Sequence, residues 1–253
     1  MAEIVDLIDK IKRYYKFTPS ELKGLVISII VVAFIISFND WGIGSVFDVK
    51  AGLLNFFNAI LIVALSFLVH LSAQRVWALA TGYRHEFQMW GIGLGVALVL
   101  SFITNGRAWL IIPGGFIVHH LAGHRLGWFR YGINYWAIGL IAFVGPLASI
   151  AFAAVFKSIG GLVSNALIQK VIIFNVLYAV FSMLPVPPLD GAKVYFGSRM
   201  LYAFALPAIV VATILMIVKI PILFALVLSL LVAVVLWLTY YISFEKDVWF
   251  GPK

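Results

Sequence analysis

Residues 51–74 decide the fold class of this chain, and they read AGLLNFFNAILIVALSFLVHLSAQ. The stretch carries no charged side chain, and it exceeds the roughly 20 residues that an α-helix needs to cross a bilayer core about 30 Å thick. Of the 253 residues, 11% are charged and 64% are hydrophobic, whereas soluble domains carry about 25% charged residues. The sequence therefore predicts an integral membrane protein whose main solvent is the lipid bilayer.

Six other runs also lack charged residues. They occupy residues 24–39, 87–106, 131–156, 171–189, 200–218 and 220–244. We expect an all-α polytopic membrane protein with about six transmembrane helices, in which residues 87–106 form a re-entrant or hairpin segment after the second helix. We also expect residues 1–23 to be a polar N-terminal lead and residues 24–253 to be a single transmembrane domain.

The basic residues favour the re-entrant interpretation. Cytoplasmic loops are enriched in Lys and Arg, and a full third span would place Arg107, Arg125 and Arg130 outside. A re-entrant segment places 14 of the 18 basic residues inside. The four exceptions are Lys50, Lys157, Lys170 and Lys219. Such a segment is allowed at membrane depth where protein or a water-filled cavity covers its backbone. We therefore expect both termini in the cytoplasm, with the cell membrane as the default location.

The remaining composition limits the kinds of partner and ligand. The chain has no cysteine, so disulfides and thiolate ligands are excluded, and a metal would need His, Asp, Glu or Asn ligands. The net charge of +8 comes from basic residues in short segments between apolar runs. This pattern is typical of the positive-inside bias of membrane proteins, and it argues against nucleic acid as a partner.

Three features mark positions where chemistry could occur. Asp190 follows the prolines in the run Pro185-Val-Pro-Pro-Leu-Asp-Gly191. An ionisable residue near membrane depth is a functional candidate, although a solvated Asp or a helix N-cap explains it equally well. His70 and Gln74 share one helical face, yet a lone His in a membrane helix more often bonds to a neighbouring helix than to a ligand. The run Val144-Gly-Pro-Leu-Ala-Ser149 is more simply explained by close helix packing.

In this order the three features resemble the site-two protease family of intramembrane zinc metalloproteases. That family carries His-Glu-x-x-His on one helix, a Gly-Pro-Leu-Ala-Asn type run on the next core helix, and an Asn-rich stretch that leads to Leu-Asp-Gly. The resemblance covers about residues 50–200 and implies a core like that of the family. The matching residues are Gly145, Pro146, Asn175, Pro187, Pro188 and Gly191, and Pro113-Gly-Gly-Phe116 resembles the family's glycine-containing hairpin.

The departures from the family pattern fall at its catalytic positions. The family motif uses two His as zinc ligands and the Glu as general base, and the carboxylate after the prolines is the third ligand. His70 matches the first His and Asp190 matches the carboxylate, but Leu71 replaces the Glu and Gln74 replaces the second His. A catalytic zinc takes three protein ligands, and a general base contributes about 10²–10⁴-fold. The resemblance therefore implies that zinc is possible and that peptidase activity is lost or much reduced.

Two smaller replacements accompany these departures, since Ser149 and Ser182 stand where the family commonly has asparagines. Glu86, which follows His85, is the nearest substitute carboxylate in sequence, and it could reach His70 only if the chain reverses.

Three functions remain open at this point. The first is a protease-like protein with a degraded site that binds transmembrane segments of other proteins. The second is an active intramembrane zinc metalloprotease, with His70 and Asp190 as ligands and Gln74, His120 or His124 as the third. His119, His120 and His124 are more simply explained as an interfacial segment near anionic headgroups. The third function, a transporter or channel, would need more polar residues in the membrane interior.

Overall fold

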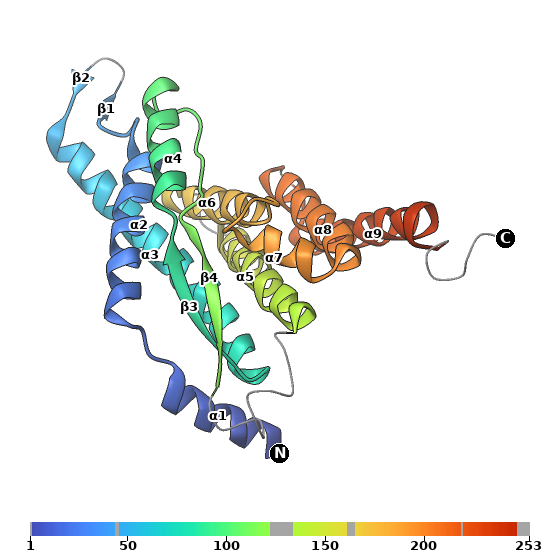
Figure 1. Ribbon diagram of the computed structural model, residues 1–253. Coiled ribbons are helices and arrows are strands. Elements are labelled where there is room, and N and C mark those ends of the chain that lie inside the picture. Colours follow the sequence, from blue (N-terminus) through green and yellow to red (C-terminus); the bar gives the residue numbers. More distant parts are fainter. Residues whose placement is uncertain (1, 44–45, 122–133, 161–164, 219, 247–253) are drawn as a thin grey trace. The chain divides into compact units, whose positions relative to one another are not determined.

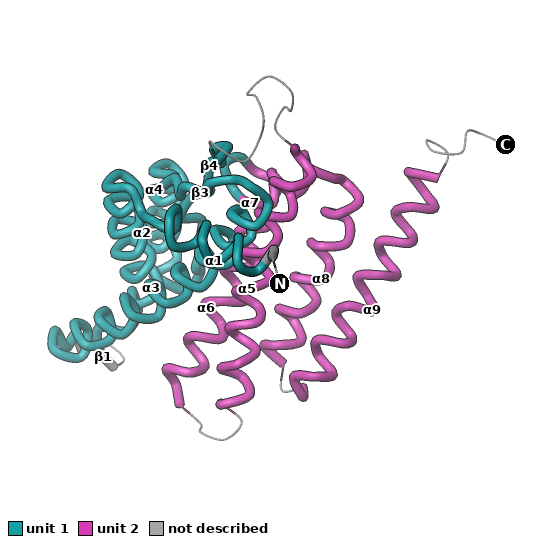
Figure 2. Tube along the Cα trace, turned by 90° about the horizontal axis from the view of Figure 1, so that it is seen from below, with its two compact units in different colours: residues 1–133, 187–189 teal, residues 134–186, 190–253 magenta. Residues whose placement is uncertain are grey.

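The computed structural model describes residues 2–43, 46–121, 134–160, 165–218 and 220–246 (Figure 1). The chain divides into two compact units, which Figure 2 colours separately. Unit 1 contains Met1–Ile133 and Pro187–Leu189, and unit 2 contains Asn134–Val186 and Asp190–Lys253.

Unit 1 begins with three helices. They are α1 (Ala2–Tyr14), α2 (Pro19–Ser37) and the 32-residue α3 (Val49–Ala80), and the short strands β1 (Gly42–Ile43) and β2 (Val46–Phe47) pair between α2 and α3. Side chains fix where the two long helices begin. Thr18 and Glu21 cap α2 reciprocally, and the Asp48 carboxylate accepts hydrogen bonds from the first backbone N–H groups of α3.

The segment predicted to be re-entrant is a helix between two paired strands. The helix α4 (Gly91–Ile103) has 13 residues and rises about 20 Å, which is too short for a bilayer core of about 30 Å. Strand β3 (Tyr83–Met89) precedes it and strand β4 (Gly114–His120) follows it, and the two strands pair antiparallel along their whole length. The chain therefore turns back on itself here, as a hairpin segment requires.

Unit 2 consists of helices. They are α5 (Tyr135–Gly160), α6 (Ala166–Ser182), α7 (Asp190–Gly197), α8 (Arg199–Ile217) and α9 (Ile222–Tyr240), which continues as a π-helical turn over Tyr241–Glu245. Helix α5 packs against α6 and α7, while α8 packs against α6 and α9. The close approach of α5 and α7 depends on glycine, because a Cβ on Gly197 would meet the α5 backbone at Tyr135 and Gly139.

A lysine joins two helices of unit 2 near their ends. Lys157, close to the C-terminus of α5, donates hydrogen bonds to the carbonyl oxygens of Leu215, Met216 and Val218 at 3.1, 2.8 and 2.9 Å. These carbonyls lie at the end of α8, where the helix supplies no backbone donors. One ammonium group with three donors thus satisfies three backbone acceptors.

The prediction of an all-α polytopic membrane protein is confirmed. Five of the described helices are long and apolar enough to cross a membrane, namely α2, α3, α5, α8 and α9 with its π-helical turn. Helix α6 has 17 residues and is shorter, since it ends at Ser182 ahead of the prolines 185, 187 and 188. Helix α3 instead runs six residues beyond its predicted end at residue 74 and includes the charged Arg75.

Candidate functional site

The C-terminal third of α3 buries the residues whose spacing resembles the catalytic motif of the site-two proteases. His70, Leu71 and Gln74 are 1%, 4% and 1% exposed. His70 and Gln74 lie one helical turn apart, so their side chains leave the same face of α3. Leu71 therefore places an aliphatic side chain in the interior of unit 1, next to two buried polar groups.

A second imidazole reaches the place where the family has its second His. After α3 the chain reverses at Gly82, whose φ of +82° is a conformation that favours glycine, and strand β3 then brings His85 to Gln74. His85 Nε2 donates to Gln74 Oε1 at 3.1 Å, and the Phe116 ring stacks on the buried imidazole with centroids 4.7 Å apart. His85 thus arrives at Gln74 from a different element of unit 1.

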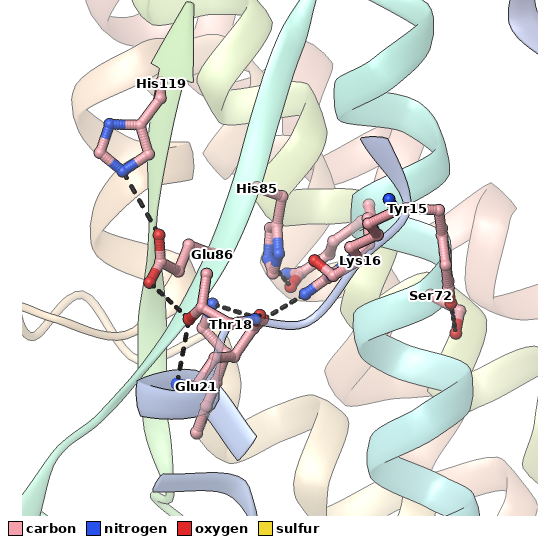
Figure 3. A network of polar contacts seen from close by, with 11 residues as sticks. Tyr15, Lys16, Thr18, Glu21, Ser72, His85, Glu86 and His119 are labelled. Atoms are coloured by element: carbon pink, nitrogen blue, oxygen red, sulfur yellow. Dashed lines mark hydrogen bonds and ion pairs between the residues drawn. The ribbon is translucent and has the colours of Figure 1, made fainter. Parts of the chain in front are cut away.

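The neighbouring Glu86 points to the other side of the strand pair. Side chains alternate along a strand, and the Glu86 carboxylate accepts a hydrogen bond from Thr18 Oγ1 at 3.0 Å and lies 3.6 Å from His119 Nε2 (Figure 3). Glu86 could substitute for the general base only if the chain reversed after α3, and the chain does reverse. The alternation of side chains along β3, however, directs His85 rather than Glu86 toward Gln74. Glu86 is therefore not placed to act as a base beside His70.

The other histidine candidates lie elsewhere on strand β4 or outside the described residues. His120 is exposed, and its ring lies against the buried Tyr83 with centroids 5.0 Å apart. His119 is exposed on the Glu86 side of the strand pair. His124 lies outside the described residues.

Directly after Gln74, the buried Arg75 side chain forms a cluster with residues of the N-terminal lead. Its guanidinium pairs with the Glu21 carboxylate, donates to the Lys16 carbonyl oxygen at 2.9 Å, and lies over the Phe17 ring at 4.0 Å from the centroid. The same Glu21 oxygen accepts the backbone N–H of Phe87 at 2.9 Å (Figure 3). This Arg75 cluster ties α2, α3 and β3 together and allows the helix to carry a charge into the interior.

Unit 2 holds the carboxylate candidate. Asp190 is the first residue of α7 and is 5% exposed. Burial lowers the pKa of the Lys193 ammonium, one turn along α7, below its ordinary value, and the negative charge of Asp190 acts in the opposite direction. Asp190 therefore has an electrostatic partner within its own unit.

The other motif residues of unit 2 serve close packing. A Cβ on Gly191 would collide with the carbonyl group of Met183, so only glycine fits there.

Asn175 is fully buried, and its Nδ2 donates to the Val171 carbonyl oxygen at 2.9 Å. Ser182 Oγ donates to the Ala179 carbonyl oxygen at 2.9 Å, while Ser149 is fully buried within α5. Gly145 and Pro146 are also buried inside α5, and Pro187 and Pro188, which precede α7, belong to unit 1.

The donor set around His70 in unit 1 does not fit a catalytic zinc by itself. Such a zinc takes three N, O or S protein ligands and a water, whereas unit 1 supplies the imidazoles of His70 and His85 and the amide of Gln74. That amide oxygen already accepts the His85 proton. Within either unit, the described residues include no group of three or more His, Asp or Glu side chains placed to hold a metal ion.

Comparison with known proteins gives one informative similarity. A curated protein of Methanocaldococcus jannaschii, named "Putative zinc metalloprotease", is 29% identical over 185 residues, which make up 71% of this chain and 85% of that protein. No protein-family model matches the chain, and no solved structure matches it. The similarity therefore covers most of both chains.

Proposed function

We propose that this chain, a divergent site-two-protease-like membrane protein, has lost peptidase activity and acts by binding transmembrane segments of other membrane proteins. The observation that carries the proposal is Leu71, which is buried at the position of the general base. A leucine has no group that can take a proton from water, and loss of a general base costs about 10²–10⁴-fold in rate.

The hydrogen bond between Gln74 and His85 supports the same conclusion. An amide oxygen is a poor zinc ligand beside imidazole. Here the Gln74 amide oxygen accepts a hydrogen bond from His85 Nε2 at 3.1 Å. A zinc ion between His70 and Gln74 would compete with this buried hydrogen bond, whose loss costs about 1–3 kcal/mol for each polar group left unsatisfied. The side chains therefore favour a direct polar contact over metal coordination.

The binding role follows from what the fold retains. The described part of the chain keeps five helices that can cross a membrane and a hairpin segment of paired strands. A protease-like fold that loses its base and one ligand keeps the surfaces that would accept a transmembrane segment. Binding without cleavage is then the remaining activity.

One experiment tests the loss of chemistry. The purified protein in detergent is analysed for bound zinc and incubated with a transmembrane substrate beside the His70→Ala variant. We expect less than stoichiometric zinc and no cleavage by either protein. Cleavage that disappears in His70→Ala would overturn the proposal.

A second candidate function is supported by His85 itself. If the imidazoles of His70 and His85 bound zinc, the chain would be an intramembrane metalloprotease with an unusual ligand set. That function requires stoichiometric zinc that is lost in both His70→Ala and His85→Ala. Equal metal content in these variants and the unmodified protein would eliminate it.

A further inference from the structure

A groove with two chemical halves lies in unit 1 between the first turns of α2 and strand β3. Its volume is about 460 Å³. Ser20 and Lys23 line it from α2 and Glu86 lines it from β3, and the apolar Ile27 and Met89 complete it. None of these residues belongs to the site around His70 and Gln74.

The polar and apolar groups of the groove are ordered along the helix. Thr18, just ahead of α2, contacts Glu86, and further along Gly24 lies against Met89, where an added Cβ would be 3.2 Å from the Met89 Cβ. Strand β3 and helix α2 therefore run alongside each other, with Glu86 near the start of α2, Met89 beside Gly24, and Ile27 about one turn beyond Lys23. Because α2 is long and apolar enough to cross a membrane, its start lies toward the interface.

The two charges of the groove are of opposite sign. Lys23 is exposed, and among the described residues it has no hydrogen-bond or ion-pair partner. The Glu86 carboxylate is 23% exposed at the side chain and is held in place by Thr18. The Lys23 ammonium, which can bind a phosphate, thus lies across the groove from the Glu86 carboxylate, which can accept hydrogen bonds from an amine.

We propose that this groove binds a phospholipid with a zwitterionic, amine-bearing headgroup. Lys23 binds the phosphate, Glu86 accepts hydrogen bonds from the headgroup amine, and Ser20 adds a hydroxyl. The lipid's acyl chains leave the groove past Ile27 and Met89. An anionic headgroup without an amine satisfies Lys23 but leaves Glu86 facing like charge.

The surface that continues from the groove favours a lipid over a peptide. Further along α2, Val26, Ile27 and Ile30 are 53%, 37% and 48% exposed, so the helix presents apolar surface to the bilayer. An acyl chain extends along such a surface without leaving polar groups unpaired. An extended peptide would carry backbone N–H and C=O groups into the same apolar region, where each unpaired group costs several kcal/mol.

Lipid retention measured by native mass spectrometry tests the proposal. The full-length protein is reconstituted in nanodiscs of equal parts phosphatidylethanolamine and phosphatidylglycerol, released into detergent, and scored for bound lipid. We expect retained phosphatidylethanolamine, a several-fold loss in Lys23→Gln, and no loss in the matched control Lys50→Gln at the exposed start of α3. Equal retention in both lysine variants would overturn the proposal.

The carboxylate and the groove volume are tested separately. Glu86→Gln keeps an oxygen for Thr18, so it should fold and should shift the retained lipid from phosphatidylethanolamine toward phosphatidylglycerol. Ser20→Trp fills the groove from an exposed position of α2 and should lower retention of both lipids, with helicity by circular dichroism as the folding control. An unchanged lipid preference in Glu86→Gln would overturn the assignment of the amine.

Two further experiments distinguish a bound phospholipid from a free headgroup and from a peptide. Free phosphoethanolamine is added to delipidated protein, and a photo-crosslinking residue is placed at Gln88, which also lines the groove. We expect no retention of the free headgroup and crosslinks to phospholipid. Retention of the headgroup without acyl chains, or crosslinks to a peptide in place of lipid, would overturn the proposal.

Discussion

Gln74 and Arg75 are neighbours on α3, yet they belong to two buried clusters of different character. Arg75 contacts an opposite charge in the first turn of α2, and a backbone carbonyl oxygen and an aromatic ring in the segment that leads into α2. Gln74 accepts a hydrogen bond from His85 of β3. The first cluster joins three elements of unit 1, while the second lies where the resembling family has its catalytic chemistry.

The difference shows which part of the helix has a structural role. Burying a guanidinium is tolerable only with a charge partner and further hydrogen bonds, and Arg75 has both. The contact of Gln74 with His85 is a hydrogen bond rather than an ion pair, so its loss removes no charge partner. Variants in the two clusters should therefore differ in size of effect, and the following expectations run from the largest to the smallest.

Removing one partner of the Arg75 cluster should have the largest effect. Glu21→Ala leaves the Arg75 guanidinium buried without its carboxylate, which should lower the free energy of unfolding by about 3–5 kcal/mol. Thermal unfolding in detergent measures the change. The double variant Glu21→Leu with Arg75→Met removes both charges and should recover most of the loss. A loss below about 1 kcal/mol in Glu21→Ala would show that the cluster is not structural.

Restoring the family motif should create metal-dependent stability. The double variant Leu71→Glu with Gln74→His supplies a second imidazole at i, i+4 from His70, together with a carboxylate. At a zinc concentration of about 100 times the dissociation constant, binding should stabilise this variant by about 2.7 kcal/mol. Zinc content and thermal unfolding with and without a chelator measure the effect. The unmodified protein should not respond to the chelator, and an equal response would contradict the proposed loss of the metal site.

Breaking the Gln74–His85 pair should have an intermediate effect. His85→Leu leaves the buried Gln74 amide oxygen without this donor, which should lower the free energy of unfolding by about 1–3 kcal/mol. The double variant with Gln74→Leu should be closer to the unmodified protein, since both polar partners are then gone. If the single and double variants lose equal stability, the hydrogen bond is not the cause.

Removing the cap of α2 should cost less. Thr18→Ala deletes the hydroxyl that accepts the Glu21 backbone N–H and donates to Glu86, and caps of this kind contribute about 0.5–2 kcal/mol. Thr18→Ser keeps the hydroxyl and should restore the stability. A serine variant as unstable as the alanine variant would assign the effect to the lost methyl group.

The exposed contact of His119 with Glu86 should have the smallest effect. The His119 side chain is 53% exposed, and exposed ion pairs contribute about 0–1 kcal/mol. His119→Gln should therefore change the unfolding midpoint little at any salt concentration. A large loss would indicate that His119 has a structural role in the strand pair.

Much of the architecture could be predicted because lipid imposes strict rules on sequence. Uninterrupted apolar runs locate the helices, and the charge bias identified residues 87–106 as a hairpin segment, where the chain has a 13-residue helix between two strands. Leu71 and Gln74 could be identified as departures by their spacing from His70 alone. Helix α6 ended earlier than its apolar run because the prolines after it cannot continue a helix.

The end of α3 could not be predicted, because its cause lies far away in the sequence. Arg75 marked the end of a charge-free run, yet the helix continues to Ala80 because Glu21, 54 residues earlier, neutralises the charge. His85 was also missed as a neighbour of Gln74. A signal was present, since Tyr83, His85 and Phe87 alternate with Arg84, Glu86 and Gln88 in the period of two that is typical of a strand.

Lys157 has a consequence for the order in which the protein is made. Its three carbonyl partners lie 58 to 61 residues later in the chain, at the end of α8. During synthesis, α5 therefore reaches the bilayer before its lysine has any of these acceptors. The ammonium must stay hydrated at the interface until α8 emerges from the insertion machinery. The last turn of α5 thus completes its membrane placement only when a later helix arrives.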